Sequence, residues 1–180
     1  MKYYAHSKEG RPVEEWQELD EHLRGVAERA RQVAGKIGLG NMGELIGLLH
    51  DLGKYSEAFQ SYLKVADGIN EADEDECAEI AVVKGRIDHS TAGGQDLWQV
   101  MAKGDHASRL AAQLMALCVV SHHSGLIDCV SPIGDDLFTL RMNKARDRTH
   151  IDEVAVRMDS VLRKRVDRLL KDSSIQDSVI

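Results

Sequence analysis

Apolar residues recur every three to four positions along much of the chain, which is the period of an amphipathic helix. This spacing predicts helices over residues 14–34, 42–52, 56–65, 90–101, 107–122 and 151–170. No segment shows the strict alternation of a half-buried strand, and the chain contains only two prolines. The pattern therefore predicts an all-α fold, a helical bundle of about six or more helices.

The helix predicted over 107–122 carries a row of apolar residues that we expect to face the core. Leu110, Leu114 and Cys118 follow one another at steps of four, so Cys118 is expected to be buried. His122 comes four residues after Cys118 and continues the same face. A buried imidazole without a partner costs free energy, which a metal ion would offset.

The 180 residues, 43% of them apolar, are enough for one domain with one core, which we take to span 1–180. No apolar run is long enough to cross a membrane, and the N-terminus lacks the layout of a signal peptide, so we expect a cytoplasmic protein. The net charge is −7. Such a chain does not attract a nucleic acid by its overall field, so metal ions or a local basic patch would have to do so.

Several histidines stand at positions where a helix should be apolar or should end. The pair His50-Asp51 closes the helix predicted over 42–52, and Gly53 and Lys54 follow it. One imidazole and one carboxylate suit Mn, Fe, Co, Ni or Zn, and a carboxylate can bridge two ions. The other histidines of this kind are His22, His89, His122 and His123. Each of these histidines alone is more readily interpreted as a hydrogen-bonded core residue. However, four predicted helices each place such a histidine in the same interior.

The order of these motifs resembles a known family. They are Tyr4-Ala-His-Ser7, Trp16-x-x-Leu-x-x-His-Leu23, His50-Asp-Leu-Gly-Lys54 with Phe59-Gln60, Asp88-His-Ser-Thr-Ala-Gly93 and Ser121-His-His-Ser-Gly125. Over about residues 3–126 they resemble the HD superfamily of metal-dependent phosphohydrolases. The finer resemblance is to the HD nuclease domain of the CRISPR-associated helicase–nuclease of type I systems.

This resemblance implies a two-metal nuclease that hydrolyses phosphodiester bonds of DNA, chiefly single-stranded, in antiviral defence. One ion would be held by His22, His50 and Asp51, and a second by His89, His122 and His123, with Asp51 bridging as the catalytic carboxylate. Two ions about 3.5–4 Å apart can stabilise both the attacking and the leaving oxygen. One or two divalent ions are expected per chain (Mn, Co, Ni, Fe or Zn, with Mg possible), because imidazoles do not favour a plain Mg site.

The resemblance also implies contacts and partners. Lys54 would act in catalysis by holding a phosphate oxygen, and Lys54, Ser90 and Ser124 are the candidates for contacting nucleic acid. The partners would be single-stranded DNA, a helicase domain or subunit and, through it, an RNA-guided surveillance complex; no membrane is expected.

The chain departs from the family at one point. The family pattern ends with an aspartate on a late helix, commonly after an alanine, and the late candidates Asp159 and Asp167 lack that context. We therefore expect this ligand to lie past Ile180, and the helicase portion is absent. Two alternatives stay open: an HD phosphohydrolase acting on nucleotides or cyclic nucleotides, and a non-catalytic helical adaptor that retains the metal cage.

Overall fold

The computed structural model describes residues 1–67, 87–123 and 125–177. Within them the expected all-α architecture is confirmed, with ten α-helices and one two-stranded sheet. The α-helices are α1 (Leu19–Gly35), α2 (Gly40–Leu49), α3 (Glu57–Ala66), α5 (Thr91–Met101), α6 (His106–Ser121), α7 (Leu137–Met142), α8 (Arg146–Thr149), α9 (Ile151–Arg157), α10 (Ser160–Leu169) and α11 (Ser173–Asp177). Two 3-10 turns, η1 (Val13–Glu15) and η2 (Leu52–Tyr55), and the strands β1 (Tyr4–His6) and β2 (Gln17–Glu18) complete these parts of the chain.

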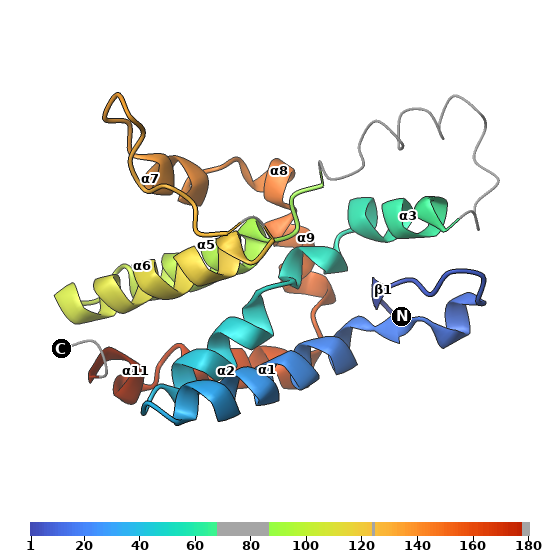
Figure 1. Cartoon of the computed structure of the whole chain (residues 1–180), viewed down its shortest axis with the longest axis horizontal. Coiled ribbons are helices and arrows are strands. Elements are labelled where there is room, and N and C mark those ends of the chain that lie inside the picture. Colours follow the sequence, from blue (N-terminus) through green and yellow to red (C-terminus); the bar gives the residue numbers. More distant parts are fainter. Residues whose placement is uncertain (68–86, 124, 178–180) are drawn as a thin grey trace.

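Two helix pairs form the frame of the bundle (Figure 1). α1 packs along α2, and α5 packs along α6. The core between these elements consists mainly of leucines and alanines, and Leu23, Leu48, Leu97 and Ala116 are fully buried. Burial of this apolar stripe, rather than local propensity, is what holds helices of this length together in water. α2 ends in the middle of the molecule, next to α9 and α5, and so carries η2 to that point.

The N-terminal region differs from the prediction. The helix expected from residue 14 begins at Leu19, and the chain before it forms η1 and β2, which pairs antiparallel with β1. The pattern predicted no strand, and this prediction is wrong for β1 and β2. The reason is tertiary: Trp16 packs into a small separate cluster with Phe59 and Leu63, which pulls its backbone out of the helix.

The helix predicted over 151–170 is in fact two helices, α9 and α10. Met158 has an extended backbone, and Asp159 caps α10 by accepting a hydrogen bond from the Leu162 backbone N–H at 3.1 Å. Aspartate is among the best N-cap residues because its carboxylate pairs with one of the unsatisfied N–H groups of the first turn. A continuous apolar period cannot reveal such a break, since both helices present the same face to the core.

The face that α6 buries is also not the expected one. Leu110, Leu114 and Cys118 are exposed, and the prediction that Cys118 lies in the core is wrong. The buried apolar residues of α6 are mostly small: Ala107, Ala111, Ala112, Met115, Ala116, Val119 and Val120. Small side chains let α6 lie close along α5, so the alanine face, rather than the leucine face, meets the core.

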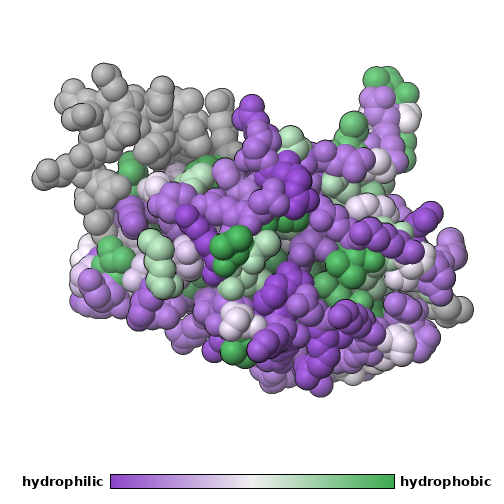
Figure 2. All heavy atoms as spheres, turned by 180° about the vertical axis from the view of Figure 1, so that it is seen from behind, coloured by the Kyte–Doolittle hydropathy of each residue, from purple (hydrophilic) through white to green (hydrophobic). Residues whose placement is uncertain are grey.

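Within residues 1–67, 87–123 and 125–177, no helix combines the length and apolar character that a bilayer crossing requires. The face shown in Figure 2 is mostly hydrophilic, and its apolar residues stand in small separate patches. Apolar side chains exposed singly or in small patches are common on folded proteins.

Candidate metal centre

The centre is built where α2 ends and η2 begins. His50 and Asp51 lie at this junction, and two residues later the Gly53 backbone N–H donates to the His89 carbonyl at 3.0 Å. A Cβ at Gly53 would lie 2.4 Å from the His89 Cα, so only glycine allows this approach. The glycine after the His-Asp pair therefore brings the segment before α5 against the end of α2.

One oxygen of the Asp51 carboxylate faces two histidines. Asp51 Oδ2 lies 3.1 Å from the Nε2 atom of His22 and 3.1 Å from that of His50. The two Nε2 atoms are themselves 3.2 Å apart. Ligands of one tetrahedral ion at about 2.1 Å stand roughly 3.4 Å apart, so these three atoms have nearly the spacing of a shared coordination sphere.

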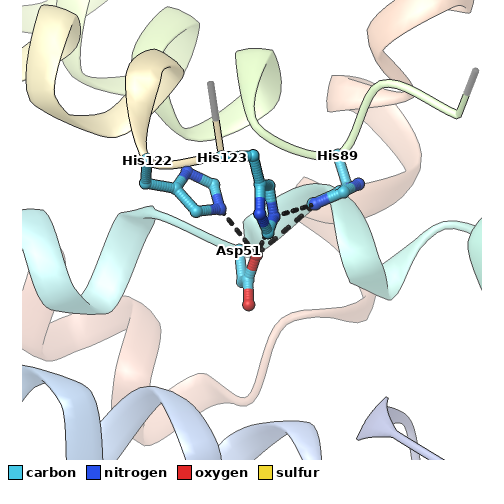
Figure 3. Close-up of side chains that lie close together, drawn as sticks. All are labelled: Asp51, His89, His122 and His123. Atoms are coloured by element: carbon cyan, nitrogen blue, oxygen red, sulfur yellow. Dashed lines mark hydrogen bonds and ion pairs between the residues drawn. The ribbon is translucent and has the colours of Figure 1, made fainter. Parts of the chain in front are cut away.

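The other oxygen faces a second set of histidines (Figure 3). Asp51 Oδ1 lies 3.2 Å from His122 Nε2, 3.8 Å from His89 Nε2 and 4.0 Å from His123 Nε2. His89 comes from the segment before α5, and His122 and His123 follow the end of α6. His89 and His123 approach each other to 2.7 Å between their Nε2 atoms. One buried carboxylate thus serves two groups of imidazoles.

Backbone carbonyls fix the orientation of three of these rings. The Nδ1 atoms of His50, His122 and His89 lie 2.8, 2.6 and 3.1 Å from the carbonyl oxygens of Gly47, Val119 and Ile87, respectively. A carbonyl can only accept, so each Nδ1 must carry the proton. In the neutral ring, Nε2 then presents a lone pair.

The Nε2 atoms of these three rings lie 3.1–3.8 Å from the Asp51 oxygens, and a lone pair facing a carboxylate calls for a positive charge between them, which a metal ion or a proton supplies. The donor set, imidazole nitrogen with one carboxylate, is that of a site for a divalent transition metal. Histidines that bind a metal through one ring nitrogen usually donate a hydrogen bond from the other, as these Nδ1 atoms do. The residues present therefore fit a metal ion on each side of Asp51.

The electrostatics keep Asp51 ionised. Burial by itself would raise the pKa of this carboxyl, which is only 2% exposed. Hydrogen bonds from protonated Nε2 atoms of His122, His22 and His50 outweigh burial and hold the pKa far below its usual range, and a bound metal ion would take the place of these protons. Burial lowers the pKa of His89 to about 4, so that ring is neutral at pH 7. The centre thus combines a charged bridge with a neutral donor.

Lys54 places a fixed positive charge beside the Asp51 carboxylate. Its Nζ lies 2.9 Å from Asp51 Oδ2 and donates to the Ala5 carbonyl at 3.0 Å. The side chain is buried, with 3% of the residue exposed. The ammonium therefore joins the centre to β1, and the prediction that Lys54 contacts a phosphate stays a prediction.

The structure places the remaining predicted residues as follows. Ser90 is buried and its hydroxyl accepts from the Arg141 guanidinium at 3.0 Å, a partner that the sequence did not suggest. Ser124 lies outside the described residues. Asp159 caps α10 and pairs with Arg24, and Asp167 pairs with Arg163.

His6 lies beside the centre, although it was not among the predicted ligands. Its ring centroid is 4.9 Å from that of His22, and the ligand atoms of His6, His22 and Asp51 lie within 4.8 Å of one another. Burial, and after it the Lys54 charge, lowers the pKa of His6. The available signal was its place in the Tyr4–Ser7 motif, but nothing in the spacing connects this motif to the helices.

A helical bundle that surrounds a helix-terminal His-Asp pair with further histidines defines an HD-type domain, a class of metal-dependent hydrolases. Residues 14–176 match the family model described as "Cas3, HD domain", and the chain belongs to this family. Membership makes it a metal-dependent nuclease domain of CRISPR defence. No curated protein matches the chain in a sequence search.

Proposed function

We propose that this chain is a single HD-type nuclease domain that cleaves DNA, chiefly single-stranded, with the help of divalent transition-metal ions. The observation that carries the proposal is the position of the Asp51 carboxylate: its two oxygens face two separate sets of imidazole nitrogens. A carboxylate in this position can serve two ions at once, as phosphodiester cleavage by paired metals requires.

His22 and His50, with Asp51 Oδ2, would hold one ion. The ligands of the other would be His89, His122, His123 and Asp51 Oδ1. Imidazole-rich ligation favours Mn, Fe, Co, Ni or Zn over Mg, which prefers oxygen ligands. Occupancy is one or two ions per chain.

When bound, such ions generate a nucleophile from water near neutral pH and stabilise charge on a phosphate. The chain itself contributes fixed geometry. The Gly47, Val119 and Ile87 carbonyls hold three rings with their Nε2 atoms toward the Asp51 carboxylate, where these rings would hold the ions. Lys54 holds Asp51 in place, and its charge limits the cost of burying that carboxylate.

One side of the centre is open to solvent, as a polymeric substrate requires. The His123 side chain is 56% exposed, so the Oδ1 side of the centre borders on solvent. The net charge of −7 would repel free DNA, and two divalent ions would bring +4 to the place where the phosphate must sit. A helicase partner, recruited in the cytoplasm by an RNA-guided surveillance complex, would deliver the single strand.

The proposal is tested by incubating the metal-free protein with circular single-stranded DNA in separate reactions, to each of which one metal is added: Mn, Co, Ni, Mg or Zn. Cleavage of the circle is expected with at least one transition metal. Asp51→Asn should abolish it because the amide cannot serve two ions, whereas Asp128→Asn, a change at an exposed aspartate, should cut as the parent does. Release of nucleoside from nucleotides, without cleavage of DNA, would instead support the nucleotide hydrolase. Cleavage by Asp51→Asn at the parent rate would refute the proposal.

A further inference from the structure

The N-terminal strand β1 is attached directly to the segment that follows the His-Asp pair. Buried Gln60 at the start of α3 binds both sides of one β1 residue: its side-chain oxygen accepts from the Tyr4 N–H at 3.0 Å, and its Nε2 donates to the Tyr4 carbonyl at 2.9 Å. The same Nε2 atom donates to the Lys54 carbonyl at 2.7 Å. The position of β1 is thus set by the residues that also position Asp51.

A second attachment acts on the next residue of the strand. Ala5 is buried, and its carbonyl accepts from Lys54 Nζ, the atom that also approaches Asp51 Oδ2. At its other edge β1 pairs with β2, and the Tyr3 carbonyl accepts from the Leu19 N–H at 2.8 Å. These contacts leave β1 little freedom, and its last residue, His6, is held beside His22, the ring whose Nε2 faces Asp51 Oδ2.

The ligand count on that side leaves a place for His6. His22, His50 and Asp51 supply three protein ligands, and zinc-like ions take four or more. Among the described residues, Asp51 is the only carboxylate in either candidate group. Asp159 and Asp167 are used in helix capping and in pairs with arginines, and neither belongs to a candidate ligand group.

We propose that His6 is a further ligand of the ion on the Oδ2 side of Asp51, so that β1 is part of the metal centre. The inference rests on the proposed function in that it requires this cluster to bind an ion. The resulting set of three imidazoles and one carboxylate selects a transition metal over Mg. Binding of the ion also ties the N-terminal segment to the bundle.

The test is a Co²⁺ titration of the full chain, followed by calorimetry and by the visible absorption of bound cobalt, with metal content measured independently. His6→Phe keeps a ring of similar size but has no ligand atom. It should weaken one ion by about 10-fold or more, change the cobalt spectrum, and leave the ion on the Oδ1 side bound as in the parent. His106→Phe, at an exposed histidine that begins α6, is the matched control and should bind as the parent does.

A second variant, His6→Asn, has a smaller side chain and so controls for any effect of the size of the phenyl ring on metal binding. The circular dichroism spectra of both metal-free variants should match that of the parent. Parent-like affinity and spectrum in folded His6→Phe and His6→Asn would overturn the His6 assignment and leave the proposed function standing, because Asp51→Asn would still lose cobalt. If the parent itself bound no cobalt, both the assignment and the proposed metal centre would fall.

Discussion

Replacing Gly53 by alanine tests how the two halves of the metal centre are held together. The new Cβ would lie 2.4 Å from the Cα and 2.5 Å from the carbonyl oxygen of His89. Carbon atoms in contact stand about 3.5 Å apart, so the two backbones must separate by roughly 1 Å. The Gly53 backbone does not have a positive φ, so alanine is not strained there for any other reason.

The expected cost follows from this separation. Overpacking against backbone costs about 1–3 kcal/mol, and stretching the Gly53 to His89 hydrogen bond, now 3.0 Å, forfeits roughly 1 kcal/mol more. For a chain of 180 residues each kcal/mol lowers the melting temperature by about 2–4 °C, so a drop of roughly 6–12 °C is expected for a change near 3 kcal/mol. Metal ligands tolerate errors of only about 0.2 Å, so affinity on the His89 side should fall as well.

Thermal unfolding of the metal-free protein and a Co²⁺ titration measure the two effects. Gly25→Ala is the control: this glycine lies within α1, a Cβ there would meet no atom within 4 Å, and the change should stabilise the helix by about 0.5–1 kcal/mol. If Gly53→Ala melted at the parent temperature and bound cobalt equally well, the close approach of the two segments would not be what positions His89.

Three further predictions concern charge and metal. Lys54→Met removes the ammonium beside buried Asp51 and should destabilise the metal-free protein by about 3 kcal/mol, read as a lower melting temperature; an unchanged value would contradict this role. Glu44 is buried between Arg31 and Arg165, which hold its pKa below the usual 4.5 despite burial, so Glu44→Gln should destabilise by about 1–3 kcal/mol at pH 7. Because the pKa is lowered on folding, that contribution is present above pH 4.5 and is lost as the pH falls through the folded pKa; urea denaturation at a series of pH values should show the two proteins converging there, and a gap that persists would refute the reasoning. Adding Mn²⁺ or Co²⁺ to the metal-free protein at 100 times its dissociation constant should stabilise it by about 2.7 kcal/mol, an increase that Asp51→Asn should lack and that EDTA should reverse.

Much of this protein was predictable because its signals are local. Helical periodicity identified the segments of α1, α2, α3, α5 and α6 to within a few residues, since an apolar stripe must face a core wherever that core lies. The His-Asp pair at the end of a helix, followed by glycine and lysine, marked the centre for a similar reason: a turn that presents two ligands is encoded in adjacent residues. The histidines expected around it, from His22 to His123, do lie together in the structure.

What the sequence could not decide depends on distances between segments far apart in the chain. Only the tertiary structure divides the Asp51 oxygens between two sets of imidazoles, buries Lys54 under β1, and brings His6 to His22. The break at Asp159 and the alanine face of α6 belong to the same category. In each case the apolar spacing along the sequence is compatible with two structures, one continuous helix or two, and a buried leucine face or a buried alanine face. Periodicity indicates that a helix has a buried face. Which face is buried, and which element covers it, depends on the packing of the whole chain, where small side chains and a helix cap can outweigh the local pattern.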